Sequence, residues 1–448
     1  MGIHNKGLII ALIASVLMYA VSISFVAPNQ AFLAGAITLL VVLWSNEALP
    51  MAVVSLLPII LFPALGILDT KATASGYSNP IVYLFLGGFM IAIAVEKTHL
   101  HRWIAYHLLG FFPHSVRGVI FALAFTSALL SSILSNTTTT LLLMSIGLFL
   151  SEEPRIKMRY LLSIAYGASI GGIITPIGTA PNLIFLGFLG EKGLESIPFV
   201  EWVIMVAPLA AVMLIIMASI LSIGVGRVEV SRESEHPALD GAQQKVLFAL
   251  ITLMGVLFVN APIKPYWDGL GLSEEGIMLS FGLLMFVPQF GLLDWMEDKG
   301  KIPFRIMFLF GAGFAIAKAF SKTGLADTLA HSLGAFSGLE LWMLLFFVAV
   351  LITFATEITS NTALISVMLP VIYAFSMQHH LDATLFMMVA TLCASYAFML
   401  PIATPPNAIV MSSGSIHIKQ MAMYGLVLNF VGIALIVLCA TTYWEIFK

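Results

Sequence analysis

Charged residues are scarce in this chain of 448 residues. Asp, Glu, Lys and Arg make up 10% of it, whereas hydrophobic residues make up 60% and the mean hydropathy is +1.02. A water-soluble domain of this length does not need so much apolar surface. The composition therefore predicts an all-α polytopic membrane protein, and the net charge of −3 indicates no particular partner.

Cysteine is nearly absent as well. Cys393 and Cys439 fall in apolar segments, which argues against a disulfide framework or a cysteine metal site. The apolar segments contain no Ser-His-Asp triad, metal-ligand cluster or nucleotide-binding loop, so we expect no enzyme. The stretch from Met1 to Ala20 imitates a signal peptide but lacks a convincing cleavage site, and we expect a retained first helix.

What the sequence does contain is an internal repeat. The triplet Ser135-Asn136-Thr137 recurs in the second half of the chain as Ser360-Asn361-Thr362. At the same offset, the segment 84–100 matches 309–325, and more than half of the paired positions are identical. An offset that holds without a gap indicates a duplicated structural unit.

Each triplet lies inside a long apolar segment, roughly 118–150 and 340–376. Basic residues flank the first segment at both ends, which does not fit a helix that crosses a bilayer once. Two apolar arms with polar residues at the bend instead predict a re-entrant hairpin, whose tip must be buried in protein or line a cavity. A hydrophobic helix with a polar stripe is the alternative.

The other apolar segments predict about 11 transmembrane helices, two of them broken. The broken helices, 160–190 and 384–412, contain the repeated motifs TPIGTAPN (175–182) and LPIATPPN (400–407), whose prolines remove backbone donors. The remaining spans are roughly 8–26, 31–46, 51–68, 79–96, 199–223, 245–262, 276–293, 303–320 and 420–443.

The distribution of basic residues predicts the orientation. With a cytoplasmic N-terminus, most of the Lys and Arg side chains fall on the inner side of the membrane. The two halves are then inverted repeats, an arrangement common in secondary transporters. We expect a multi-pass protein of the cell inner (plasma) membrane with its C-terminus outside.

Two hairpin tips and two helix breaks then converge near the membrane midplane. Free carbonyls at a break suit a hard cation such as Na⁺, and half-helix N-termini suit an anion. Neither hairpin nor broken helix contains Lys or Arg at its polar motif. A bound anion would depend on dipoles, hydroxyls, amides and bound cations, which predicts obligatory coupling to Na⁺.

Two charged residues stand out inside apolar segments. Glu357 replaces Ser132 of the first repeat, and it is either a structural acceptor that braces the second hairpin or a proton-coupling carboxylate. Lys318 either extends toward the interface or pairs locally, with Glu357 as one conceivable partner.

The paired triplets, the two proline motifs and Trp44-x-x-Glu47-Ala48-Leu49-Pro50 resemble the divalent anion:sodium symporter family, which includes bacterial Na⁺/dicarboxylate symporters. The resemblance covers nearly the whole chain. It implies transport of di- or tricarboxylates, or of sulfate in some branches, usually with Na⁺. It also implies a homodimer and an elevator-like motion of a transport domain against a scaffold.

This resemblance divides each repeat into a scaffold part and a transport part. The scaffold takes 1–112 and 245–335, and the transport domain takes 113–223 and 336–448. Residues 224–244 are rich in charged side chains, which predicts a cytoplasmic linker between the repeats. Each transport part contains one re-entrant hairpin and one broken helix.

The same resemblance places two sodium sites and a substrate site. The first sodium site comprises Ser131, Ser135, Asn136 and Gly178, and the second comprises Thr356, Thr359, Asn361 and Ala403. The substrate site comprises Asn136, Thr137, Thr179, Asn361, Thr362, Thr404 and Pro405. Ala180 stands where the second repeat has a proline, so we expect a less rigid first break.

Our leading hypothesis is therefore Na⁺-coupled symport of C4-dicarboxylates such as succinate, fumarate and malate. Symport of citrate or sulfate and exchange of dicarboxylates are alternatives within the same family. An anion channel is the alternative from another class. The expected partners are the anion, Na⁺, the lipid bilayer and a second copy of the chain, with no nucleic acid.

Overall fold

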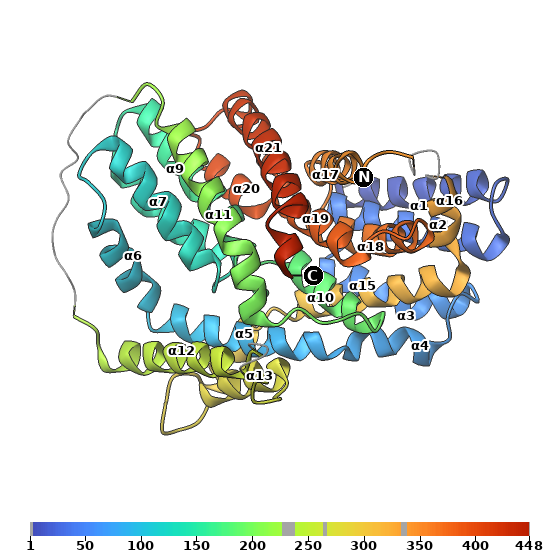
Figure 1. Cartoon of the computed structure of the whole chain (residues 1–448), viewed down its shortest axis with the longest axis horizontal. Helices are drawn as coiled ribbons and strands as arrows, with labels where there is room; N and C mark the ends of the chain where they lie inside the picture. The colour runs from blue at the N-terminus through green and yellow to red at the C-terminus, as the bar shows by residue number, and fades with distance from the viewer. Residues whose placement is uncertain (1–2, 226–237, 263–266, 333–337, 448) are drawn as a thin grey trace.

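The computed structural model describes residues 3–225, 238–262, 267–332 and 338–447 (Figure 1). Within these ranges all the regular elements are helices, as the composition predicts. Eight of the described helical segments are long and apolar enough to cross a membrane, and five shorter apolar helices accompany them.

The helices of the first half precede residue 225. They are α1 (Ile3–Ser22), α2 (Pro28–Asn46), α3 (Met51–Ala64), α4 (Thr70–Ala74), α5 (Pro80–Lys97), α6 (Leu100–Gly110), α7 (Val116–Ser131), α8 (Asn136–Phe149), α9 (Pro154–Gly172), α10 (Ala180–Glu191) and α11 (Phe199–Leu221).

The helices of the second half follow residue 240. They are α12 (Gly241–Asn260), α13 (Glu274–Leu284), α14 (Trp295–Asp298), α15 (Phe304–Thr323), α16 (Leu325–Ser332), α17 (Leu341–Thr356), α18 (Asn361–Gln378), α19 (Ala383–Ser395), α20 (Pro405–Ser412) and α21 (Ile418–Thr441).

The repeat is visible in these bounds. Helices α17, α18 and α20 follow α7, α8 and α10 at the same offset that separates the two Ser-Asn-Thr triplets. In each half a short turn joins two apolar helices into a hairpin, and a later helix breaks at the proline motif. The predicted hairpins and broken helices are thus present as helical elements, and their depth in the bilayer stays a prediction.

Three predicted spans are too long, and one of them is 8–26, because α1 ends at Ser22. The segment 276–293 is helical only to Leu284, because Pro288 has no N–H to donate to the Leu284 carbonyl oxygen. Similarly, α3 ends at Ala64, two residues before Gly66 with its φ of 68°.

The predicted linker 224–244 is also too long, because its last residues belong to α12. Asp240 caps this helix by accepting a hydrogen bond from Gln243 N at 2.7 Å, and the Gln243 side chain accepts one from Asp240 N. Residues 226–237 of the linker lie outside the described ranges.

Glycines let the central helices approach closely. A β-carbon at Gly171 of α9 would overlap the backbone of Ala128 in α7, and one at Gly167 would lie 2.6 Å from Ala124 O. Small residues four apart are a common interface between membrane helices. Figure 1 shows α7 and α9 side by side at one end, with α1–α4 and α16 at the other and α10 and α20 between them.

An ion-pair cluster joins the two predicted scaffold parts. Asp298 is 1% exposed, and its carboxylate lies 2.6 Å from Lys97 Nζ and 2.8 Å from Lys301 Nζ. Burial alone would raise the pKa of Asp298, but the hydrogen bonds from Lys301, Lys97 and the Asp294 backbone lower it to about 2. The carboxylate is therefore ionised in the folded protein at neutral pH.

Candidate functional site

The first hairpin tip meets the first helix break at Gly172. Ser131 Oγ donates a hydrogen bond to Asn136 Oδ1 at 2.6 Å, and both residues end or begin a hairpin helix. The Asn136 amide rests on Gly172, where a β-carbon would lie 2.9 Å from Asn136 Oδ1. Gly178 folds back onto the Gly172 carbonyl oxygen, which a β-carbon at 178 would overlap. The structure thus brings Ser131, Asn136 and Gly178 together.

Ser135, the fourth residue of the predicted first sodium site, caps α8. Its Oγ accepts a hydrogen bond from Thr138 N at 3.1 Å and lies 2.9 Å from Thr138 Oγ1. The Ser135 hydroxyl therefore serves the helix terminus, a typical role for a serine at this position.

The second hairpin tip repeats the first. Thr356 Oγ1 lies 2.6 Å from Asn361 Oδ1, as Ser131 does from Asn136, and it also lies 2.9 Å from Ala394 O. Thr359 instead donates its hydroxyl to Ala355 O at 2.8 Å within its own hairpin arm. Ala403 follows in the second break, where its N–H donates to Leu400 O at 3.2 Å.

An asparagine closes the loop at each break. Asn182 Nδ2 donates to Thr175 O at 2.9 Å and to Gly172 O at 3.3 Å. At the matching position, Asn407 Nδ2 donates to Leu400 O at 3.1 Å and to Ala397 O at 3.0 Å. Both asparagines are fully buried. The sequence prediction missed this role, although the two asparagines end the repeated motifs.

The two half-helices that follow the breaks begin alike. Thr179 precedes α10 with φ −145° and ψ 149°, and Thr404 precedes α20 with φ −141° and ψ 149°. Ala180 is the first residue of α10, where α20 has Pro405. The backbone conformation of the preceding threonine is nearly the same in both repeats, with or without the proline. The hydroxyl of Thr404 is buried and has no hydrogen-bond partner among the described residues.

The two repeats interlock at these half-helices. Helix α20 packs against α8 and α9 of the first repeat, and α10 packs against α18 and α19 of the second. Because α8 begins with Asn136 and Thr137, and α18 with Asn361 and Thr362, the predicted substrate residues lie on one interlocked set of helices. The first turns of α8, α10, α18 and α20 contain no charged side chain, so no acidic residue within them offsets their positive dipole ends.

The two charged outliers do not pair with each other. Lys318 Nζ donates to Ser75 Oγ at 2.7 Å, so the conceivable Lys318–Glu357 pair is wrong. Glu357 is 3% exposed, and its carboxylate accepts hydrogen bonds from the backbone of Met399 and Leu400 and from Asn429. This geometry is that of a structural acceptor at the second hairpin.

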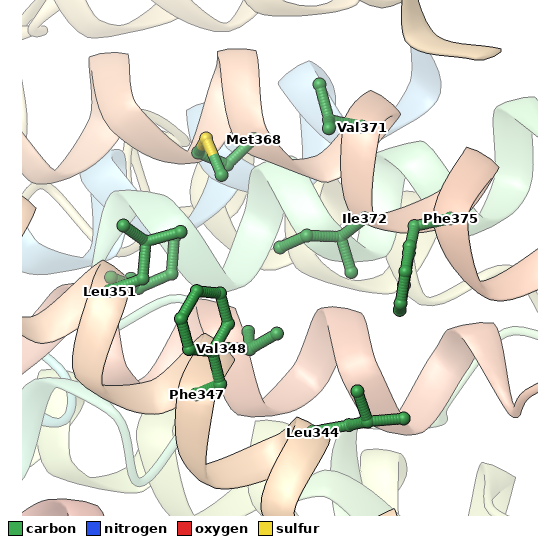
Figure 2. A pocket seen from close by; sticks show the side chains of 9 residues that line it. Leu344, Phe347, Val348, Leu351, Met368, Val371, Ile372 and Phe375 are labelled. Carbon is green, nitrogen blue, oxygen red and sulfur yellow. The ribbon is translucent and has the colours of Figure 1, made fainter. Parts of the chain in front are cut away.

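A pocket between α17 and α18 has a different character (Figure 2). Phe347 and Leu351 of α17 face Met368, Ile372 and Phe375 of α18 across it. All nine side chains that line the pocket are apolar, and none belongs to the predicted sites. An apolar wall offers an anion neither donors nor compensating charge, so this pocket is not the candidate site.

Comparison with known proteins agrees with this architecture. The model of a family described as citrate transporter matches residues 39–392. The sodium-dependent dicarboxylate transporter SdcS of Staphylococcus saprophyticus is 29% identical, and SdcS of Staphylococcus aureus strain RF122 is 30% identical. Each alignment covers 97% of this chain and 91% of the relative.

Two solved structures share the fold. The YdaH transporter of Alcanivorax borkumensis has a TM-score of 0.56 at 15% identity, over 84% of this chain and 87% of that one. MtrF of Neisseria gonorrhoeae, from a class of antimetabolite efflux pumps, has a TM-score of 0.59 at 14% identity, over 82% and 83%. The family match extends over most of the chain and includes both hairpins and the first break, so this protein belongs to the citrate transporter family and is a membrane transporter rather than an enzyme.

Proposed function

We propose that this protein is a secondary active transporter that couples Na⁺ to the movement of C4-dicarboxylates such as succinate, fumarate and malate. The observation that carries the proposal is the duplicated hydroxyl–asparagine pair, Ser131–Asn136 and Thr356–Asn361, at the start of a helix in each repeat. The names of the SdcS relatives support both the ion and the substrate class.

The donor set fits a hard cation at each tip. Hydroxyl, amide and backbone carbonyl oxygens are the ligands that such ions prefer. Ser131, Asn136 and Gly178 would hold one Na⁺ with help from Ser135, and Thr356, Asn361 and Ala403 would hold a second. Because Thr359 donates its hydroxyl to Ala355 O, it contributes to the second site through an oxygen lone pair or its backbone.

The anion would lie between the two tips. A dicarboxylate presents two charged ends, and Asn136–Thr137 and Asn361–Thr362 offer an amide and a hydroxyl to each end. The N-terminal turns that follow Thr179 and Thr404 add backbone N–H groups and favourable dipoles. The bound Na⁺ ions would supply the positive charge that these side chains lack.

We further propose that the hairpins and broken helices move together against the scaffold, in a homodimer with cytoplasmic N-termini. Small residues support a sliding interface between the two parts. In the scaffold helix α15, Gly313 faces Ser366 of α18, whose Oγ would lie 2.7 Å from an added β-carbon. In the transport helix α10, Gly187 packs closely on Phe314 and Ile81 of the scaffold.

The test is uptake of labelled succinate into proteoliposomes with and without a Na⁺ gradient. We expect saturable uptake that requires Na⁺ and shows counterflow, and the absence of counterflow would favour a channel. Uptake that ignores the Na⁺ gradient would refute the coupling. Competition by citrate in the same vesicles tests the second candidate substrate, which the description of the matching family favours. Competition by sulfate tests the remaining alternative.

A further inference from the structure

Each hairpin tip is joined to the helix break of its own repeat, but with different chemistry in the two repeats. In the first repeat, the Thr175 hydroxyl in the break donates to the backbone carbonyl of Ser132 at the tip. The corresponding residues of the second repeat are Leu400 and Glu357. Leucine has no hydroxyl to donate, so the connection of the first repeat cannot form there.

Glu357 makes the second connection from the opposite side. Its Oε1 accepts a hydrogen bond from Met399 N at 2.9 Å, and its Oε2 accepts one from Leu400 N at 3.0 Å. The polar side chain has thus moved from the break to the tip, while the same two repeat positions are still joined. Asn429 of α21 also donates to Glu357 Oε1, at 2.7 Å, and ties the tip to a third element.

The geometry points to Glu357 as a positioning residue that fixes the second hairpin tip to the second break, as Thr175 fixes the first. This inference rests on the proposed Na⁺-coupled transport, because the two joined elements contain the predicted ligands of each Na⁺ ion. Thr356 directly precedes Glu357, and Ala403 lies three residues after Leu400. Releasing the connection would separate the oxygens that must surround one cation.

The partners of the Glu357 side chain explain why a carboxylate suits this position. Its two oxygens face the N–H groups of Met399, Leu400 and Asn429, which all donate to them. Both carboxylate oxygens can accept such bonds, whereas a glutamine would turn an NH₂ group toward some of these donors.

The experiment replaces the connection of the second repeat with that of the first. Glu357→Ser removes the carboxylate, and Glu357→Ser combined with Leu400→Thr rebuilds the arrangement of the first repeat in the second. We expect the single variant to raise the Na⁺ half-saturation of uptake about tenfold or more, and the double variant to return it to within about threefold of the wild type. Glu357→Gln should raise the Na⁺ half-saturation as Glu357→Ser does, because the amide NH₂ group of glutamine cannot accept a hydrogen bond from the N–H donors that surround it.

Glu340→Gln is the matched control, because Glu340 is an exposed carboxylate at the start of the same hairpin. It should leave the Na⁺ half-saturation unchanged. Wild-type Na⁺ dependence in Glu357→Ser would overturn the inference. A double variant that folds but transports no better than the single one would overturn it as well.

Thr175→Val keeps the test decisive if Glu357→Ser does not fold. It removes one neutral hydrogen bond from the first repeat and should raise the Na⁺ half-saturation about threefold. Recovery of folded protein in the double variant would support the exchange. No recovery, together with wild-type Na⁺ dependence in Thr175→Val, would overturn it. If the wild type itself shows no Na⁺-driven uptake, the proposed function fails, and the exchange is judged from folded yield and thermal midpoint alone.

Discussion

The two helix breaks should differ in whether they tolerate a methyl group at one equivalent position. Gly178 lies in the first break, and a β-carbon there would overlap the carbonyl oxygen of Gly172. That oxygen already accepts a hydrogen bond from Asn182 Nδ2 at 3.3 Å. Gly178→Ala must therefore displace backbone rather than a flexible side chain. The equivalent position of the second repeat is Ala403, where the loop already accommodates a methyl group.

The magnitude follows from overpacking. Forcing one methyl group into a closed backbone loop costs about 1–3 kcal/mol. If the displaced loop holds the first Na⁺, this cost appears in Na⁺ binding, and the affinity falls by about 5-fold to 150-fold. Gly190→Ala is the control, because this glycine follows in α10 and no atom of the described residues lies within 4 Å of an added β-carbon. It should leave Na⁺ binding unchanged.

The assay is thermal unfolding of the purified protein across a Na⁺ titration, with choline maintaining the ionic strength. A ligand that binds the folded state raises stability in proportion to the logarithm of its concentration above Kd, so the titration reports Na⁺ affinity without knowledge of the anion. We expect Gly178→Ala to shift the Na⁺ dependence to higher concentration. Unchanged Na⁺ dependence in a folded Gly178→Ala protein would refute the placement of a sodium site at the first break.

Three further predictions concern other residues. Asn136→Ala should abolish Na⁺-driven uptake while expression stays near normal, and near-normal transport would remove this side chain from the site. Asp298→Asn should lower the unfolding free energy by about 1–3 kcal/mol, because it leaves Lys97 beside a neutral partner; a wild-type thermal midpoint would contradict this. Burial raises the pKa of Glu274 to about 7, although its carboxylate accepts a hydrogen bond from Phe199 N at 2.8 Å. The folded state then retains a proton that the unfolded chain releases at its ordinary pKa of 4.5, so this contribution to stability is present at low pH and lost as pH rises through about 7. The thermal midpoint should fall between pH 5 and pH 8, and Glu274→Gln should lessen that fall; an equal fall in both proteins would contradict the assignment.

Local chemistry made much of the fold predictable. Hydropathy locates apolar helices because each segment must satisfy its backbone internally and shed its charges. Clustered prolines remove several backbone donors, so both breaks are found at the repeated motifs, whereas single prolines such as Pro208 and Pro370 lie inside helices. Local chemistry failed where a glycine with positive φ ended a helix early, as at Gly66, since a hydropathy profile does not register backbone angles.

The sequence selected candidate residues for the site but did not specify their contacts. The repeat and the family resemblance selected Ser131, Asn136, Thr356 and Asn361, and the structure pairs them as Ser131 with Asn136 and Thr356 with Asn361. The partner of Glu357 was not predictable, because Asn429 lies far along the chain on a helix that the motif does not include.

The sequence by itself determined the class of protein, the duplication, and the places where helices break, because these depend on composition and on neighbours along the chain. Only the tertiary structure decided that each half-helix packs against the other repeat, that Asn182 and Asn407 close the breaks, and that Thr175 and Glu357 exchange roles. These contacts depend on which surfaces meet in space. A buried carboxylate or hydroxyl can bond to any backbone group that the fold brings within about 3 Å, and no local pattern specifies that group.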